Sequence, residues 1–371
     1  MKSELVSKID KHWSSFSPDE ALNIFNFLPI KKYFFSLISG KNIDLWDSTN
    51  NADINLWTIE EILKEHLPFS KMLSIGCGQG FLERLCFFNG VFKECVGFDI
   101  SQGSIKIAKE LAEKNDIKNI QYIVSDAEDF DWENQKFDLI WANGSLHHIK
   151  NIETIIEKIF GSLNIGGFFI CNEYVGPNQQ QLSNRHLEII NSVIHLIPEE
   201  LKHRTEDSFT PSFFRRPKFR RVIWEILGIL TFRNSILSLD DFQINYNLSN
   251  TSKKLYHIYR KIKEKQIRQR KKFRFGKVYD NDPYYFRLVD PSECINSSKI
   301  ISSIKKFFKN VDIRYYNGSL LKDCIDPKFI RNFDINNINH RKILNFLIET
   351  EKFLIDVGEI EPHFAHIICQ K

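Results

Sequence analysis

The chain lacks the cysteine patterns that define disulfide-rich domains and zinc sites. Its seven cysteines are an odd number, and no two of them have CxxC spacing. Even sets of closely spaced cysteines are typical of small secreted domains, and CxxC pairs are typical of zinc sites. Both classes are therefore excluded, and we interpret the cysteines as reduced, mostly buried apolar residues.

The chain also lacks an apolar run long enough to cross a membrane. Its most apolar later stretch, residues 222–239, is interrupted by Glu225 and Arg233. The first residues have neither the apolar core nor the cleavage site of a secretory signal. We therefore expect a cytoplasmic protein with no membrane span.

Neither sign of charge dominates. The 51 Lys and Arg residues against 47 Asp and Glu give a formal net charge of +4, so composition alone requires no nucleic acid or membrane partner. Residues 253–277 are locally basic, which suits binding to phosphates of RNA, a lipid headgroup or a nucleotide-activated substrate. An apolar stripe in that segment instead favours a helix with a solvated basic face. The stripe consists of Leu255, Ile258, Tyr259 and Ile262.

A glycine-rich turn follows an apolar run in the first third of the chain. Residues 72–80 read MLSIGCGQG, and a second apolar run ends at Asp99. Glycines permit a tight turn and a close approach of the backbone to a ligand. The order strand, glycine turn, helix, strand and carboxylate places Asp99 where it can accept hydrogen bonds from the ribose hydroxyls of an adenosine.

The glycine spacing distinguishes between adenosine cofactors. It is GxGxG with Phe81 following, whereas dinucleotide-binding loops have GxGxxG. The loop resembles motif I of the class I S-adenosylmethionine-dependent methyltransferases. Three further segments, residues 121–128, 137–149 and 163–174, resemble the later motifs of that family in the same order.

The resemblance implies an α/β fold, in which a doubly wound, seven-stranded, mostly parallel sheet has an antiparallel last strand. We expect the sixth strand near residues 311–316 and the seventh near 363–369, with the seventh between the fifth and sixth. Gly166 and Gly167 are expected to form a left-handed cap after a helix. The predicted units are an N-terminal helical extension (1–65), a cofactor-binding core (66–176), a helical and basic cap insertion (177–290), and a C-terminal part (291–371) that completes the sheet and contains a helical insertion (318–358).

The same resemblance assigns the cofactor-binding residues. Gly76, Cys77, Gly78 and Gly80 contact the methionine and ribose moieties through their backbone, Asp99 binds the ribose, Ile100 and Ala127 line the adenine, Asp126 recognises its amino group, and Asn143 contacts the cofactor. Asp126 has a second interpretation as a helix cap.

One position departs from the family pattern. Many members have an acid at the position of Ser74, where it helps to hold the amino group of the cofactor, and serine carries no charge. Glu83, on the helix after the loop, is a possible substitute. The alternative is that Glu83 is a solvated helical residue.

The acceptor side of the site is expected beyond the fourth strand. A hydroxyl acceptor must lose a proton, and histidine is suited to take it. His148 is the first choice for this base and His147 the second, while Glu173 and Tyr174 are candidates for contact with the substrate. The alternative for all four is a structural role. Residues 290–293 are expected to form a turn and a helix start, and the sequence shows no metal-binding constellation.

These patterns predict an S-adenosylmethionine-dependent methyltransferase that acts on a polar small molecule, with O-methylation of a sugar or specialised-metabolite intermediate as the leading reaction. An RNA methyltransferase that uses residues 253–277 is one alternative. It is disfavoured because the chain has no Asn/Asp-Pro-Pro-aromatic motif after the fourth strand. A non-catalytic scaffold subunit that binds S-adenosylmethionine is another alternative.

Overall fold

A computed structural model describes residues 24–47, 52–133, 135–202, 290–325 and 330–371. The basic segment 253–277, the apolar stretch 222–239 and most of the expected cap insertion lie outside these described residues. Among the described helices, none is long and apolar enough to span a membrane.

Seven strands form one sheet in the order β3-β2-β1-β4-β5-β7-β6. The strands are β1 Phe69–Ile75, β2 Phe92–Asp99, β3 Ile120–Val124, β4 Phe137–Asn143, β5 Leu163–Tyr174, β6 Asn310–Tyr315 and β7 Phe364–Gln370. Strands β1 to β5 are mutually parallel, and β7 runs antiparallel between β5 and β6. This arrangement confirms the predicted fold class, including the position of the last strand.

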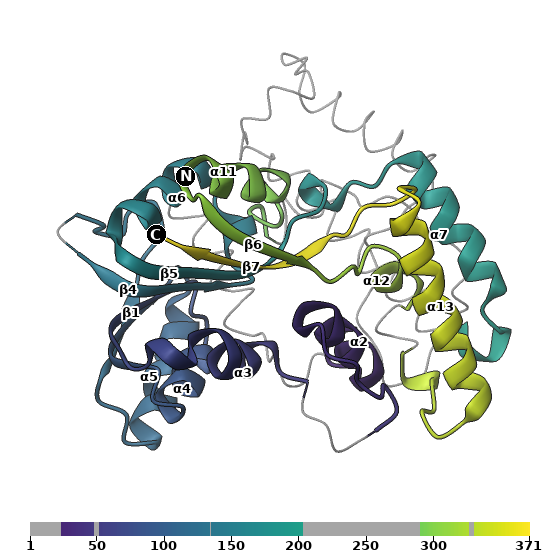
Figure 1. The fold of residues 1–371 in the computed structure, drawn as a ribbon, viewed down its shortest axis with the longest axis horizontal. Helices are drawn as coiled ribbons and strands as arrows, with labels where there is room; N and C mark the ends of the chain where they lie inside the picture. Colours follow the sequence, from purple (N-terminus) through teal and green to yellow (C-terminus); the bar gives the residue numbers. More distant parts are fainter. Residues whose placement is uncertain (1–23, 48–51, 134, 203–289, 326–329) are drawn as a thin grey trace, which may run out of the picture.

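Helices cover both faces of the sheet (Figure 1). On one face lie α3 Ile54–Trp57, α4 Phe81–Phe88 and α5 Gln102–Lys114, and on the other lie α6 Ile152–Ser162 and α11 Ile300–Phe307. Alternate residues of a buried strand point to opposite faces. Accordingly Met72 of β1 packs on the side of α4, while Leu73 packs on the side of α6.

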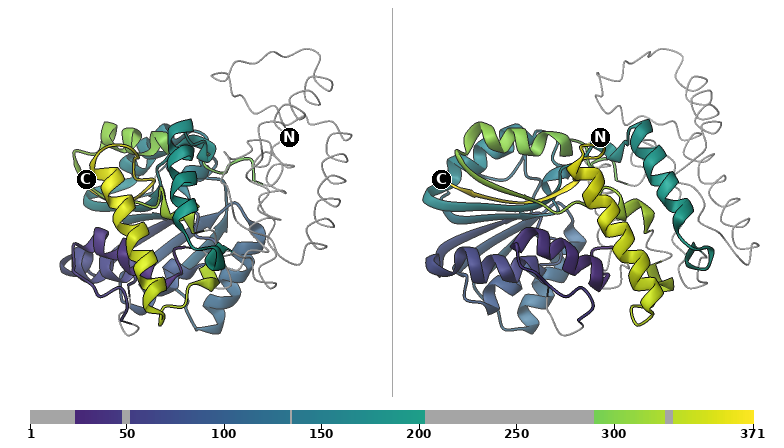
Figure 2. Two further views of the ribbon diagram at one scale, coloured as in Figure 1. Left: turned by 90° about the vertical axis from the view of Figure 1, so that its right-hand side faces the viewer. Right: turned by 45° about the vertical axis from the view of Figure 1, so that its right-hand side comes forward.

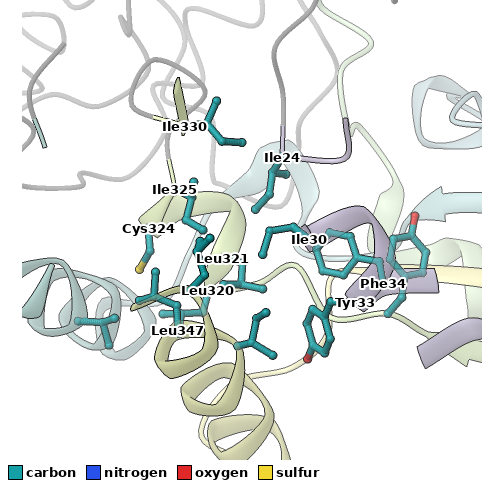
Figure 3. Close-up of a cluster of buried hydrophobic side chains, with 14 of the residues drawn as sticks. Ile24, Ile30, Tyr33, Phe34, Leu320, Leu321, Cys324, Ile325, Ile330 and Leu347 are labelled. Carbon is teal, nitrogen blue, oxygen red and sulfur yellow. The ribbon is translucent and has the colours of Figure 1, made fainter. Parts of the chain in front are cut away.

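A third group of helices lies at the end of the sheet where β5 finishes and β7 begins (Figures 1 and 2). It consists of α2 Leu28–Ser39, α7 Asn184–Leu196, α12 Leu321–Cys324 and α13 Ile338–Asp356. Their apolar faces form one buried cluster, in which Ile30, Leu320 and Leu347 take part (Figure 3). The shorter helical turns are η1 Thr58–Leu63, η2 Lys64–His66, η3 Leu146–His148, η4 Asn178–Gln180, η5 Glu199–Lys202, η6 Ser297–Lys299 and η7 Ile330–Asn332.

The glycine pair before the fifth strand has a different role from the expected helix cap. Helix α6 ends at Ser162, and its C-cap residue Leu163 has extended backbone angles. Gly166 is left-handed, with φ of 79°, but it lies inside β5, where its N–H donates to the carbonyl of Lys371 at 2.8 Å. The glycines therefore shape a strand, and the prediction of a glycine cap was wrong.

Candidate active site

The glycine loop between β1 and α4 has left-handed backbone angles at three positions. The φ angles of Gly76, Gly78 and Gly80 are 64°, 52° and 76°. A Cβ on Gly76 would come within 2.4 Å of the Ser145 Cβ, whereas a Cβ on Gly78 would meet nothing within 4 Å. The loop therefore packs tightly at its first glycine and leaves backbone open to a ligand at the second.

Asp99 lies at the end of β2 and faces this loop. Its Oδ2 accepts a hydrogen bond from the N–H of Gly78 at 2.9 Å, and its Oδ1 accepts one from the N–H of Ser101 at 2.8 Å. The open backbone at Gly78 thus adjoins a fixed carboxylate. A carboxylate accepts hydrogen bonds only, as the hydroxyl donors of a ribose require, so these residues fit S-adenosylmethionine.

The remaining expected cofactor residues follow other strands at the same edge of the sheet. Asp126 comes after β3, and its Oδ1 accepts a hydrogen bond from the N–H of Glu128 at 3.0 Å, as a capping residue does. Ala127 is buried, and Ile100 is half-buried beside Asp99. Asn143 ends β4. The structure brings these residues to one edge, while their contacts with a cofactor remain predictions.

Glu83 has no access to solvent. It lies in the first turn of α4, and neither of its carboxylate oxygens has a hydrogen-bond partner among the described residues. Burial raises the pKa of Glu83 to about 7, and the nearby Ser74 and Arg84 offset only part of that rise. The interpretation of Glu83 as a solvated residue was therefore wrong, and a buried carboxyl group lies beside the position where the family acid is missing.

His147 is fixed by a buried glutamate. Its Nδ1 lies 2.7 Å from Oε2 of Glu173, whose Oε1 also accepts hydrogen bonds from the N–H groups of Ser145 and Leu146, both at 2.8 Å. Burial alone would lower the pKa of His147, but its hydrogen bond and attraction to Glu173 raise it above the usual value. Glu173 therefore lies behind the histidine and orients it.

His148 faces a segment that is distant in the sequence. Its Nδ1 lies 3.1 Å from the hydroxyl of Ser292 and 3.6 Å from Oδ2 of Asp290, and its Nε2 lies 3.7 Å from Oε2 of Glu293. Ser292 in turn donates to Asp290. The N–H of Ile295 donates to the carbonyl of His147 at 3.0 Å, which ties this segment to the histidine turn.

The charges of this histidine–carboxylate cluster, defined as His147, His148, Glu173, Asp290 and Glu293, influence one another. Burial lowers the pKa of His148, and the adjacent His147 lowers it further. Burial would raise the pKa of Glu293, but the two imidazoles outweigh it and hold the pKa at about 2. Sequence reasoning missed Asp290 and Glu293 as members of a site, because it interpreted residues 290–293 only as a turn.

Tyr174 lies at the end of β5 but faces protein. Its hydroxyl donates to the carbonyl of Pro177 at 3.1 Å, and the Lys322 ammonium lies 5.0 Å from the centre of its ring. The residue is buried. These contacts are those of a packing residue, and its contact with a substrate stays a prediction.

Comparisons with known proteins point to one family. A family model described as a methyltransferase domain matches residues 68–262, which is more than half of the chain. The chain is 25% identical over 143 residues to demethylmenaquinone methyltransferase of Lactococcus lactis, covering 38% of this chain and 53% of that protein. It is 30% identical over 130 residues to ribosomal protein L11 methyltransferase of Staphylococcus haemolyticus, covering 34% and 40%.

A solved S-adenosylmethionine-dependent methyltransferase from Clostridium acetobutylicum is 23% identical, covers 39% of this chain and 56% of its own, and has a TM-score of 0.29. The chain matches only about half of the length of these relatives. The domain match lies on the sheet with the glycine loop and Asp99 at its carboxyl edge. The chain belongs to the class I family of S-adenosylmethionine-dependent methyltransferases.

Proposed function

We propose that this protein transfers a methyl group from S-adenosylmethionine to a hydroxyl oxygen of a polar small molecule, such as a sugar or a specialised-metabolite intermediate. One observation carries the proposal. Ser145 packs on Gly76 of the cofactor loop and lies two residues before His147, so the loop and the histidine–carboxylate cluster are adjacent. Methyl transfer requires that donor and acceptor lie in such proximity.

The residues of the loop hold the cofactor. When bound, S-adenosylmethionine supplies a methyl group on a positively charged sulfur. Gly76, Gly78 and Gly80 let the backbone approach the ligand, and Asp99 accepts hydrogen bonds from the ribose. Cys77 takes part through its backbone, because burial raises the pKa of its thiol well above the usual value and keeps it neutral.

The histidines bind and activate the acceptor hydroxyl. His147 and His148 are both largely buried, with 12% and 18% of their side chains exposed, and they are surrounded by carboxylates. Such a set of donors and acceptors suits a ligand that carries several hydroxyl groups. An apolar acceptor would leave these buried polar groups unpaired, at a cost of about 1–3 kcal/mol for each group.

Calorimetric titration with S-adenosylmethionine and S-adenosylhomocysteine tests the first half of the proposal. We expect binding by the intact protein, and a loss of binding in Asp99→Ala and in Gly78→Ala. Methyl transfer to a panel of nucleotide sugars and free polyols then tests the acceptor class. An intact protein that fails to bind either ligand refutes the proposal, and binding without transfer to any polyhydroxyl acceptor refutes the acceptor class.

A further inference from the structure

The histidine–carboxylate cluster has a second property, which rests on the proposed function and concerns how the acceptor is activated. One potential ligand atom from each of His147, His148 and Glu293 lies within 4.8 Å of the other two. Two ligands about 2.1 Å from a common ion lie roughly 3.4 Å apart in a tetrahedral site. The side chains are thus almost close enough to coordinate one ion in their present positions.

The hydrogen bonds of His148 determine which of its nitrogens faces Glu293. Ser292 donates its hydroxyl hydrogen to Asp290, so the Ser292 oxygen accepts from Nδ1 of His148 at 3.1 Å. The proton of a neutral imidazole is then on Nδ1, and Nε2 carries the lone pair. This lone pair lies 3.7 Å from the Oε2 atom of Glu293. Two acceptors therefore face each other across a gap that a cation would bridge.

His147 and Glu293 are oriented in the same way. Glu173 engages Nδ1 of His147 at 2.7 Å, which leaves Nε2 for a further ligand. Oε1 of Glu293 accepts from the side-chain amide of Gln180 at 3.1 Å, which leaves Oε2 toward His148. Histidine ligands of metals are commonly held by a carboxylate on their other nitrogen, because that contact fixes the tautomer and the ring orientation.

We propose that His147, His148 and Glu293 bind a divalent transition-metal ion that receives a hydroxyl of the acceptor. Two imidazoles and one carboxylate suit zinc and the neighbouring divalent metals, and three protein ligands leave coordination positions for water or substrate. Coordination makes a hydroxyl more acidic, and its proton passes to solvent. The histidines then activate the acceptor as ligands, and no histidine base is needed.

Spacing along the chain hides this site. His148 and Ser292 are 144 residues apart, whereas recognisable metal motifs place at least two ligands within a few residues and the others at a regular distance. The two adjacent histidines alone do not define such a motif. The third ligand appears only because the residues 290–296 fold back onto the turn that carries the histidines.

The test is titration of Zn²⁺ into the purified, chelator-treated full-length protein in the absence of cofactor. We expect one ion per chain in the micromolar range or tighter. Glu293→Gln removes one ligand with little change in shape and should weaken binding at least about tenfold, as should His148→Ala. The control is His195→Ala, because His195 lies exposed on α7 and its loss should leave the affinity unchanged. Glu173→Gln, which changes only the group behind His147, should weaken binding about 10–100-fold.

Substitution of Co²⁺ gives a spectroscopic readout that is independent of stability. Coordination by imidazole nitrogens should produce a visible absorption band that is weakened in Glu293→Gln and lost in His148→Ala. Each variant is also titrated with S-adenosylhomocysteine, and unchanged affinity shows that the fold and the cofactor site are intact. Zn²⁺ binding that is equal in the wild type and Glu293→Gln, or no binding at all, overturns the proposal and leaves a histidine base. Failure to bind the cofactor would instead count against the proposed function.

Discussion

Ser145 lies directly against Gly76. The Ser145 hydroxyl donates to the carbonyl of Ile75 at 2.7 Å, and the space where Gly76 would carry a Cβ is filled by the serine side chain. The cofactor loop and the turn before the histidines therefore form one packed unit. A change on either side of this contact is transmitted to the other.

This contact predicts a difference between two glycines with the same backbone angle. Gly76 and Gly90 both have φ of 64°, but a Cβ on Gly90 would meet nothing within 4 Å. Gly90→Ala should therefore cost only the backbone strain, about 1–2 kcal/mol. Gly76→Ala should lower the free energy of unfolding by at least about 2 kcal/mol more and abolish cofactor binding. Chemical denaturation and calorimetry measure both, and equal losses of stability in the two variants would contradict the prediction.

The buried carboxyl of Glu83 predicts how stability depends on pH. Its pKa is about 7 in the folded protein, against an ordinary value of 4.5. The unfolded chain therefore releases this proton at a lower pH than the folded one. The contribution of Glu83 to stability is complete below pH 4.5 and is lost as the pH rises through 7, by up to about 3 kcal/mol.

Glu83→Gln removes this titration. Denaturation midpoints in urea at pH 5 and pH 8 should differ less in Glu83→Gln than in the wild type, with the variant more stable at pH 8. Asp116→Asn is the control, because Asp116 is exposed and its loss should leave the pH dependence unchanged. An identical pH dependence in Glu83→Gln and the wild type would show that Glu83 does not titrate in this range.

The proximity of Ser74 and Glu83 predicts a rescue experiment. If Glu83 replaces the missing acid of the family pattern, Glu83→Gln should weaken S-adenosylmethionine binding by about 10-fold or more, as expected for loss of a hydrogen bond to a charged group. Adding Ser74→Asp should then restore most of the affinity, because it returns a carboxylate to the same region. Calorimetry of the single and double variants decides the matter. Full affinity in Glu83→Gln would assign the residue to structure alone.

Glu351 predicts a purely structural effect in the helical group. It is fully buried in α13, and its Oε1 accepts hydrogen bonds from the N–H groups of Leu320 and Leu321 at 2.7 and 3.0 Å. Glu351→Ala leaves both N–H groups unpaired and should destabilise the protein by about 2–4 kcal/mol. Glu349→Ala, on the exposed side of the same helix, should change stability by less than about 1 kcal/mol. Comparable losses in thermal melts of the two variants would refute this role.

The sheet and the cofactor loop could be predicted because their signals are local. Apolar runs that end in glycine or an acid mark the carboxyl ends of buried strands, and the order of those runs is sufficient to define the topology. The position of β7 between β5 and β6 came from the family resemblance. The structure confirms it.

The acceptor side could not be predicted to the same extent, because its contacts are not local. Roughly 115 residues separate Tyr174 from Asp290, and no pattern within either segment indicates that they meet. The environment of Glu83 was missed for a different reason. A single glutamate in a helix is usually solvated, and only its packing against β1 and β2 shows that it is buried.

The place of β7 in the sheet has a consequence for the order in which the protein is made. Strand β6 pairs only with β7 among the described residues, and β7 is the last element of the chain. While the ribosome is still synthesising residues 364–370, β6 has emerged but has no partner, and β5 exposes an unpaired edge. Unpaired edges are the parts of a sheet most prone to association with other chains. Completion of the sheet therefore depends on the final residues of this sequence, after the cofactor loop and the histidine turn have left the ribosome.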